Sequence, residues 1–587
     1  KMQVLPRLYF HTIIFCSLIL ALSSCTTGKK NTSSLSKSAL SAYSTDTKVH
    51  AKGQQLFQAY CSPCHNFLQK GIGPGLGEVT SLVSPVWLKK FIRNAPELIE
   101  QKDIRAVQLF EEYKQLMPPF TNLKDAELEA IMAYIHTQQQ APQQEQISDL
   151  GTALTDPIPT KIAKSGLQLH IEHVMTAPVT ADKAPIARIN KMQVLPGTPD
   201  RLFIQDLRGI LYELKDKQWL IAMDMAKERP HFIHAPGMGT GLGSYTFHPD
   251  FYQNGLFYTT HTEPAKTAVA DFSYADSIKV AMQWVLTEWK LNDPKALPFA
   301  GNGRELLRVN MVTGIHGVQE ITFNPLAKRG DPEYGLLYIG VGDGGASENR
   351  YHFICNDKSR VWGSVLRIDP QGKNSKNGRY GIPRDNPYAK LSDAEACREI
   401  FCRGFRNPNR YLWTPDGRLL ITDIGHANIE ELNLGVAGGD YGWPEREGTF
   451  VINHRGKMDK VYALPASDSK LNYTYPVAQY DHDEGKAIIS GFVYTGTAFP
   501  QLRGKYVCGD INNGRLFCVE TAQLKQGQQA PFQELELKMG SELVKITELT
   551  KGIKPDFRLG LGLNGELFLF TKSDGKVYKV IDCQSNP

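Results

Sequence analysis

Pairs of short strands joined by a polar turn recur through most of this 587-residue chain. Three stretches share one plan of strand, polar turn ending in glycine, and second strand: 200–214 (DRLFIQDLRGILYEL), 504–520 (GKYVCGDINNGRLFCVE) and 565–581 (GELFLFTKSDGKVYKVI). Residues 335–345 and 417–425 begin in the same way. Short apolar runs between Gly, Asn and Asp turns indicate antiparallel strands. This texture extends over residues 165–585.

The spacing of these hairpins is irregular, which favours a β-propeller, because propeller blades repeat around an axis while the loops between them vary in length. A β-sandwich needs fewer repeats of this kind. The chain is therefore predicted to be multidomain, with a small all-α domain at residues 48–140 followed by an all-β propeller at residues 165–585. Polar residues make up both a tether at 25–47 and a linker at 141–164.

The first domain contains the pattern Cys61-Ser62-Pro63-Cys64-His65. In c-type haem attachment, two such thiols bond the vinyl groups and the histidine that follows ligates iron. Met117, in QLMPPFTNL, is the predicted second axial ligand; the alternative is that Met117 is a packing residue. Because protein atoms would fill both axial positions, the haem is expected to carry electrons rather than to bind oxygen.

Four pieces of this domain occur in the order found in class I cytochromes c, which the segment resembles: GQQLFQAYCSPCH, GIGPGL, MPPF and LKDAELEAIMAYI. The resemblance implies that the carbonyl of Pro74 accepts a hydrogen bond from the ring N–H of His65 and fixes the orientation of the ring.

The N-terminus has the form of an export signal. Lys1 and Arg7 precede an apolar run at 13–22 that is too short for a typical membrane span. Leu22-Ser23-Ser24-Cys25 resembles the lipobox of bacterial lipoproteins, which implies a signal at 1–24, a lipid on Cys25 and a membrane-anchored protein on the periplasmic side. Ordinary cleavage nearby is the alternative. The formal charge of +5 includes no long basic run, so no nucleic-acid partner is expected.

Six further cysteines remain for an oxidising compartment: Cys355, Cys397, Cys402, Cys508, Cys518 and Cys583. Cys508 and Cys518 lie on the two arms of one predicted hairpin, so they are candidates for a disulfide. Cys355 has two candidate partners, and the connectivity stays open.

The order of the motifs in the β region resembles the glucose/sorbosone dehydrogenases: GLGSYTFHPDF, HGVQEITFNP, LLYIGVGDGG, GSVLRIDPQG, IPRDNPY, GFRNPNR, TDIGHANIEELNL, GGDYGWP and ISGFVYTG. The resemblance implies a six-bladed propeller that oxidises an aldose or related sugar by hydride transfer to pyrroloquinoline quinone (PQQ). The fused c-type haem is then expected to accept the electrons and to pass them to an acceptor of the respiratory chain.

Site residues follow from the same resemblance. His316 matches the general base, and Asp343 matches the acid that orients it. Quinone-binding positions are matched by Arg406, Asn407 and Arg558, and guanidinium groups suit the three carboxylates of PQQ. The backbone carbonyls of Gly425 and His426 match calcium ligands, with Glu430 and Tyr441 as outer candidates.

Three positions depart from the family pattern. Asn512 replaces a quinone-pairing lysine, Asp556 replaces an arginine, and Gly239 replaces a glutamine that faces the sugar. Two cationic partners of the quinone are thus missing. The alternative hypothesis is a cofactor-free propeller, as in the hedgehog-interacting-protein-like branch, which binds a glycan or a protein while the haem serves a separate electron-transfer partner.

Overall fold

The computed structural model describes residues 43–62, 64–68, 70–113, 115–138, 150–197, 200–235, 237 and 239–585. Tyr43–Pro587 form one compact unit. The predicted signal, tether and lipidated Cys25 lie outside the described residues. None of the described helices is both long and apolar enough to cross a membrane.

The first described part is helical and has its own apolar core. Its helices are α2 (Thr47–Tyr60), α3 (Val79–Leu82), α4 (Pro85–Glu100), α5 (Ile104–Tyr113) and α6 (Asp125–Thr137). Asp46 begins α2, because its carboxylate accepts the N–H of Lys48 at 2.8 Å. Gly53 lets α2 cross α6 closely, since a Cβ atom there would lie 1.9 Å from the carbonyl oxygen of Ala130. This crossing positions the CSPCH segment that follows α2.

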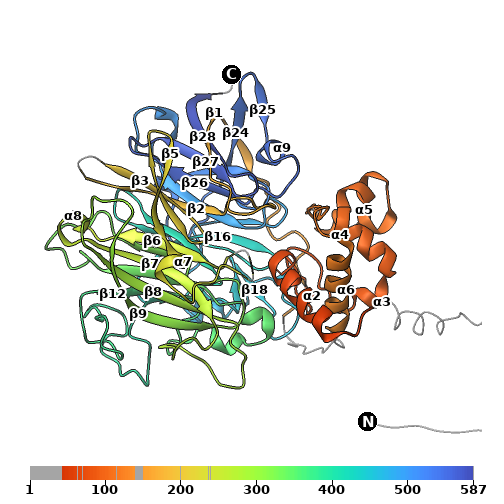
Figure 1. Cartoon of the computed structure of the whole chain (residues 1–587), viewed down its shortest axis with the longest axis horizontal. Helices are drawn as coiled ribbons and strands as arrows, with labels where there is room; N and C mark the ends of the chain where they lie inside the picture. Colours follow the sequence, from red (N-terminus) through yellow and green to blue (C-terminus); the bar gives the residue numbers. More distant parts are fainter. Residues whose placement is uncertain are drawn as a thin grey trace, which may run out of the picture. The chain divides into compact units, whose positions relative to one another are not determined.

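The β region consists of four-stranded blades, and Figure 1 labels many of their strands. The first four blades, in strand order, are β2 (Ile189–Leu195), β3 (Arg201–Asp206), β4 (Ile210–Lys215) and β5 (Gln218–Asp224); β6 (Leu242–Phe247), β7 (Leu256–Pro264), β8 (Met282–Leu291) and β9 (Gly301–Met311); β10 (Glu320–Phe323), β11 (Leu337–Val341), β12 (Ser364–Ile368) and β13 (Ile400–Arg403); β14 (Pro408–Trp413), β15 (Leu419–Asp423), β16 (Ile429–Gly435) and β20 (Ala478–Asp481).

The last two blades are joined into one sheet. The fifth blade is β21 (Ile488–Val493), β22 (Lys505–Asp510), β23 (Leu516–Glu520) and β24 (Gln533–Met539); the sixth is β26 (Phe557–Leu561), β27 (Leu567–Thr571), β28 (Lys576–Ser585) and β1 (Ala163–Thr176). Strand β1 pairs antiparallel with β28 and parallel with β24. The first strand of the region therefore completes the last blade and closes the ring.

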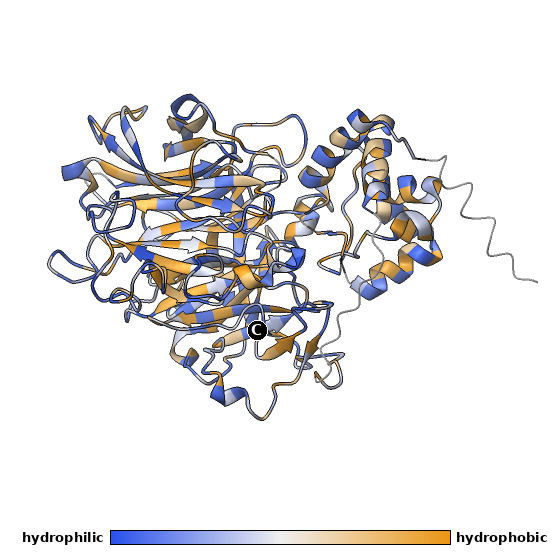
Figure 2. Cartoon of the chain, turned by 90° about the horizontal axis from the view of Figure 1, so that it is seen from below, coloured by the Kyte–Doolittle hydropathy of each residue, from blue (hydrophilic) through white to orange (hydrophobic). Residues whose placement is uncertain are grey.

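The β region also contains shorter strands and helices in addition to the six blades. They are β17 (Arg446–Glu447), β18 (Phe450–Ile452), β19 (Val461–Tyr462), β25 (Glu542–Val544), α7 (Met225–Glu228), α8 (Phe251–Asn254), α9 (Ile546–Leu549), and the 3₁₀ helices η1 (Ser347–Asn349), η2 (His352–Ile354), η3 (Asp468–Lys470), η4 (Pro500–Leu502) and η5 (Thr521–Gln523). Figure 2 shows hydrophobic residues along the strands and many hydrophilic ones in the connecting loops.

The innermost strands form a closed circuit of contacts. Strand β2 contacts β6, β6 contacts β10, β10 contacts β14, β14 contacts β21, β21 contacts β26, and β26 contacts β2. Within the described residues this is the arrangement of a six-bladed propeller, so the predicted fold class is confirmed. The three predicted hairpins are also present, as β3–β4, β22–β23 and β27–β28.

The candidate disulfide between Cys508 and Cys518 is not formed. Cys508 lies opposite Phe517, and Cys518 lies opposite Val507. Because neighbouring residues of a strand point to opposite faces of the sheet, this one-residue offset directs the two thiols to opposite faces. None of the eight cysteines of the described residues is in a disulfide.

Candidate functional site

The starts of the innermost strands meet at one end of the ring. Each blade begins with its innermost strand, so residues far apart in the sequence converge there. A cavity of about 160 Å³, the central cavity, lies at this end. Residues at or just before the starts of these strands line it: Asn190, Gly239, His316, Gln319, Arg406, Asn407, Asn409, Ala487, Asp556 and Arg558.

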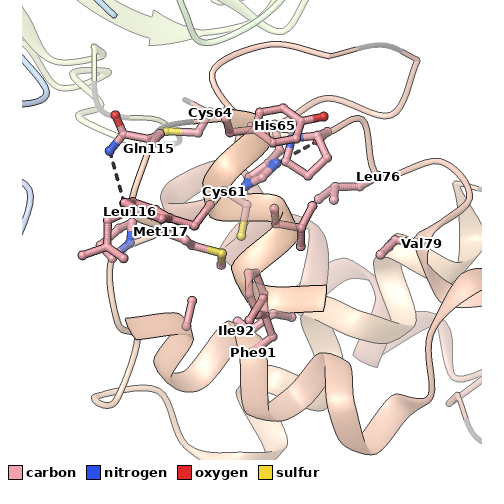
Figure 3. Close-up of a pocket in the computed structure, with 18 of the residues that line it drawn as sticks. Cys61, Cys64, His65, Leu76, Val79, Phe91, Ile92, Gln115, Leu116 and Met117 are labelled. Atoms are coloured by element: carbon pink, nitrogen blue, oxygen red, sulfur yellow. Dashed lines mark hydrogen bonds between the residues drawn. The ribbon is translucent and has the colours of Figure 1, made fainter. Parts of the chain in front are cut away.

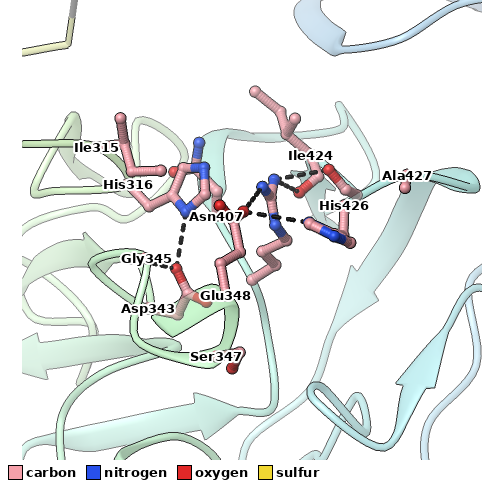
Figure 4. Close-up of polar contacts among 12 residues, drawn as sticks. Ile315, His316, Asp343, Gly345, Ser347, Glu348, Asn407, Ile424, His426 and Ala427 are labelled. Atoms are coloured by element: carbon pink, nitrogen blue, oxygen red, sulfur yellow. Dashed lines mark hydrogen bonds and ion pairs between the residues drawn. The ribbon is translucent and has the colours of Figure 1, made fainter. Parts of the chain in front are cut away.

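His316 and Asp343 form a hydrogen-bonded pair at this cavity. The Nδ1 atom of His316 lies 2.7 Å from Oδ1 of Asp343, and Figure 4 shows the two side chains pointing toward each other. Asp343 is fully buried and also accepts the N–H groups of Gly345 (2.8 Å) and of the Trp443 indole (3.2 Å). An ionised carboxylate only accepts, so Nδ1 of His316 carries the proton and Nε2 is left to accept another. This is the arrangement of an oriented general base.

The backbone around His316 is tightly packed. Its φ angle is +50°, in the left-handed region that few residues other than glycine adopt. A Cβ atom at Gly342 would lie 2.3 Å from the His316 carbonyl oxygen, and one at Gly317 would lie 2.1 Å from the indole nitrogen of Trp284. Glycines at these two positions therefore allow the loop to hold the imidazole against Asp343.

Arg406 is buried within a polar cluster of this cavity. Its guanidinium forms an ion pair with Glu348 and donates to the carbonyl oxygens of Ile424 (3.1 Å) and Gly425 (2.6 Å). Glu348 also lies 3.2 Å from Nδ1 of His426. Burial by itself raises the pKa of Glu348, but the nearby Arg406 and His426 hold this pKa well below its usual range. The carboxylate is thus ionised and neutralises part of the guanidinium charge.

Two further observations point to a polar ligand at this cluster. Arg406 Nε and His426 Nε2 are buried and have no hydrogen-bond partner among the described residues. Both residues line the central cavity. Buried polar groups usually find a partner, so such atoms commonly face a ligand or water.

The predicted calcium position, at the backbone carbonyls of Gly425 and His426, is already partly in use by other contacts. The Gly425 carbonyl faces the guanidinium of Arg406, and Glu430 accepts hydrogen bonds from Gly425 N–H (3.3 Å), Ile488 N–H (2.9 Å) and His482 (2.9 Å). The described chain has no cluster of three or more His, Cys, Asp or Glu side chains suited to a metal ion. A calcium ion here would therefore depend on carbonyl oxygens and on displacing Arg406.

Tyr441 does not serve as an outer candidate for that ion. Its hydroxyl donates to the Leu434 carbonyl and accepts the N–H of Val436 at 3.1 Å, while its ring stacks on Phe405. Both hydrogen-bonding functions of the hydroxyl are used by the backbone, so this expectation is wrong.

Positive charge dominates the central cavity. Five cationic side chains and two carboxylates line it: Arg406, Lys486, Lys554, Arg558 and Lys572 with Glu348 and Asp556. Asn512, at a position where the family pattern has a lysine, is buried with both amide atoms unpartnered in the part of the chain that the structure describes. An anionic ligand fits this set of donors, and a quinone with three carboxylates is such a ligand.

Sequence reasoning missed Glu348, Gln319 and Lys572. The amide of Gln319 donates to the Gly239 carbonyl at 2.9 Å, and a Cβ atom at Gly239 would lie 2.5 Å from the Gln319 amide nitrogen. A glutamine thus occupies the space beside Gly239 from another blade. The sequence signal for Glu348 was its place three residues after GVGDGG.

A second cavity of about 310 Å³, the haem pocket, lies among the helices. Cys61, Cys64, His65 and Met117 line it, together with apolar side chains of α4 and α5, and Figure 3 shows these groups around one space. The expected hydrogen bond is present, with His65 Nδ1 2.8 Å from the Pro74 carbonyl oxygen. The other ring nitrogen of His65 is left to ligate iron, so the residues fit a covalently bound haem.

Close packing fixes the predicted histidine ligand. A Cβ atom at Gly73 would lie 2.3 Å from Cε1 of His65, so only glycine leaves room for the ring. Arg105 also lines the haem pocket, above the Trp87 ring at 5.6 Å, and its Nε is buried without a partner among the described residues. This cation suits a haem propionate.

The two cavities share part of their lining. Cys64, His65 and Ile72 from the helical part, and Asn512 and Lys554 from the β region, line both of them. The haem-attachment segment therefore forms part of the wall of the central cavity.

Family comparisons agree with this architecture. The family model described as glucose/sorbosone dehydrogenase matches residues 190–540, and the cytochrome c model matches residues 50–139. HIPL1 protein from Arabidopsis thaliana is 27% identical over 48% of this chain and 44% of its own length. Quinoprotein glucose dehydrogenase B from Acinetobacter calcoaceticus is 26% identical over 48% of this chain and 56% of its own length.

Solved structures include the soluble aldose sugar dehydrogenase from Escherichia coli in the apo form, with a TM-score of 0.49 and 18% identity over 70% of this chain and 99% of that one. The chain spans about half the length of the curated relatives that it matches. The family model covers more than half of the chain. This protein therefore belongs to the glucose/sorbosone dehydrogenase family, and its dehydrogenase-like propeller follows a cytochrome c domain.

Proposed function

We propose that this protein is a quinoprotein dehydrogenase that oxidises an aldose or related sugar, with PQQ in the central cavity and the fused c-type haem as electron acceptor. One observation carries the proposal: His316, which is hydrogen-bonded to the buried Asp343, lines a single cavity together with an excess of cationic side chains and the haem-attachment segment.

The reaction separates a proton from a hydride. A bound PQQ would supply a hydride acceptor for the sugar carbon, and a haem held by Cys61, Cys64 and His65 would supply a one-electron acceptor. Nε2 of His316 takes the hydroxyl proton of the same carbon, and Asp343 stabilises the resulting imidazolium. Two protons reach solvent and two electrons reach the downstream acceptor for each sugar oxidised.

Cationic side chains of the cavity hold the carboxylates of the quinone. Arg558 lies beside Asp556 (2.9 Å) and Asn190 (2.9 Å), and Arg406 retains one unpartnered donor, Nε. Charge-assisted contacts of this kind contribute about 1.5 to 3 kcal/mol each. Asn407, which also lines the cavity, offers an amide for the same purpose.

Calcium is part of the proposal, at the carbonyl oxygens of Gly425 and His426. The ion would have to take the Gly425 carbonyl from Arg406, which would free the guanidinium for a quinone carboxylate. Carbonyl oxygen suits a hard cation. Chelation is therefore expected to weaken the binding of the quinone.

The fusion of the two parts explains how electrons leave the site. Cys64 and His65 line both cavities, so a haem attached to them would lie next to the space proposed for the quinone. A fused acceptor has a high effective concentration and needs no diffusional encounter. We further propose that Cys25 carries lipid, which would keep the protein at the membrane near its respiratory acceptor.

A second function has its own support. Glu348 neutralises Arg406, and Asn512 and Asp556 occupy two positions where the family carries cations. These features favour a cofactor-free propeller that binds a glycan or a protein, with the haem serving a separate partner.

Sugar-driven reduction of the haem separates the two functions. The purified ferric protein is loaded with PQQ and calcium without oxygen, a panel of aldoses is added, and the haem absorbance is followed. We expect at least one aldose to reduce the haem, and the matched His316→Ala variant to stay oxidised. If no sugar reduces a haem that dithionite reduces fully, the dehydrogenase proposal is refuted.

A further inference from the structure

Lys572 is a buried lysine whose charge is only partly compensated. It follows β27 directly, is 1% exposed, and lines the central cavity. Its Nζ lies 3.5 Å from Oδ2 of Asp556, which is longer than a close charge-assisted hydrogen bond. Lysine is seldom buried without close partners, because desolvation of its charge is costly.

Asp556 connects Lys572 to Arg558. Its other oxygen lies 2.9 Å from Nη1 of Arg558, so one carboxylate serves two cations and this wall of the cavity keeps a net positive charge. Asp556 stands where the family pattern has an arginine. Lys572, which follows the next strand, places a cation beside Asp556. It thereby compensates for the positive charge that this chain lacks at position 556 relative to the family pattern.

We propose that Lys572 is a binding residue for a carboxylate of PQQ, which replaces the arginine that is missing at position 556, and that Asp556 holds its ammonium in place. The inference rests on the proposed function, because it assumes that the quinone binds in the central cavity. It adds a residue that neither the motif order nor the family positions assign.

The electrostatic surroundings support this role. Burial and the nearby Arg558 and Arg188 lower the pKa of Lys572 well below its ordinary value, against the opposite effect of Asp556. These surroundings therefore disfavour the charged form of Lys572 unless an anion binds beside it. A carboxylate bound between Lys572 and Arg558 would offset this repulsion and would gain charge-assisted hydrogen bonds.

Calorimetric titration of PQQ into the quinone-free, calcium-loaded full chain tests the inference. We expect Lys572→Met to weaken the binding of PQQ about 10- to 100-fold, the loss of one charge-assisted contact. Lys572→Arg, which keeps the cation, should bind within a few fold of the parent. The matched control is Lys576→Met, because Lys576 pairs with Asp574 at 3.6 Å and does not line the cavity.

Thermal unfolding of the quinone-free variants is measured in parallel. The Lys572→Met variant should unfold at the same temperature as the parent or at a higher one, since it no longer buries a charge. Its stabilisation by added PQQ should shrink. This readout separates a binding residue from a structural one.

The outcomes for the two proposals differ. If the parent binds PQQ and Lys572→Met binds it equally well, Lys572 is not a ligand-binding residue, while the proposed function stands. If the parent itself does not bind PQQ, the proposed function and this inference both fail.

Discussion

Asp343 determines which nitrogen of His316 is free to act as a base. Its carboxylate accepts from His316 Nδ1, Gly345 N–H and the Trp443 indole. An asparagine has almost the same shape but could present an N–H to Nδ1, which would favour the wrong tautomer of the imidazole.

We therefore predict that Asp343→Asn lowers the rate of sugar-driven haem reduction about 100- to 10,000-fold, the range of general-base contributions. The binding of PQQ and reduction of the haem by dithionite should not change. Stopped-flow absorbance measures the rate. A variant that keeps more than a tenth of the parent rate would show that Asp343 does not orient the base.

Met117 has a testable role at the same scale. It lines the haem pocket together with His65, and methionine ligation raises the potential of a c-type haem. Met117→Ala should lower the reduction potential and allow the ferrous haem to bind carbon monoxide, which redox titration and difference spectra measure. The control is Met132→Leu, at a buried position of α6. This variant should show neither a lower reduction potential nor binding of carbon monoxide. No carbon monoxide binding in Met117→Ala would assign the sixth ligand to another residue.

Some site residues were predictable from the sequence and others were not. The five residues CSPCH are sufficient to predict haem attachment. The order of the motifs in the β region is sufficient to predict the roles of His316 and Asp343. Glu348 and Gln319 reach the central cavity from the blade β10–β13 and Lys572 reaches it from the blade of β27, and a local pattern does not reveal which loops converge. Arg406 was predicted as a cofactor ligand, but its pairing with Glu348 depends on a contact between residues 58 positions apart.

At the scale of elements, hairpins were predictable because their strands are adjacent in sequence. The pairing of β1 with β24 and β28 was not, because its partners lie more than 350 residues away and local alternation contains no information about them. The offset that separates Cys508 from Cys518 was also hidden, since hairpin register depends on turn geometry.

The crossing of α2 and α6 has a direct test. Gly53→Ala would place a methyl group 1.9 Å from the Ala130 carbonyl oxygen, so the helices must move apart. We expect a loss of about 1 to 3 kcal/mol in the free energy of unfolding of the helical part, measured by denaturant titration. The control is Gly71→Ala, where the nearest atom would lie at 3.5 Å. Equal stability of the two variants would contradict the close crossing.

A buried charge cluster links β7 to β9 and predicts acid sensitivity. Arg308 lies 2.7 Å from Glu263, and His261 lies 3.1 Å from it. Despite burial, these hydrogen bonds lower the pKa of Glu263 to about 2. The stabilisation by this carboxylate is therefore complete above its ordinary pKa and is lost as the pH falls toward 2. Burial also lowers the pKa of His261, which adds to the loss of stability below its ordinary pKa.

We predict that Glu263→Gln lowers the free energy of unfolding by about 2 kcal/mol at pH 7 and flattens its decline between about pH 4.5 and 2. Urea unfolding at several pH values measures both effects. Glu228→Gln, at an exposed position, serves as the control and should keep the parent profile. A parent protein whose stability is constant over this range would contradict the prediction.

At the scale of the whole molecule, the two parts share the wall between their cavities. Cys64 and His65 contribute from one side, and Asn512 and Lys554 contribute from the other. Such a wall suits transfer of electrons within one chain, for which no encounter between molecules is needed.

The most direct test is the dependence of haem reduction on protein concentration. The chain loaded with PQQ and calcium is mixed with excess sugar in a stopped-flow instrument, over a hundredfold range of protein concentration. The account predicts a first-order rate constant for haem reduction that does not change over this range. A mixture of two variants gives the comparison: a haem-free Cys61→Ala, Cys64→Ala chain oxidises the sugar, and a His316→Ala chain carries the haem. In this mixture the account predicts slow reduction of the haem that depends on protein concentration. A rate constant in the intact chain that rises in proportion to protein concentration, or no reduction at all, would contradict it.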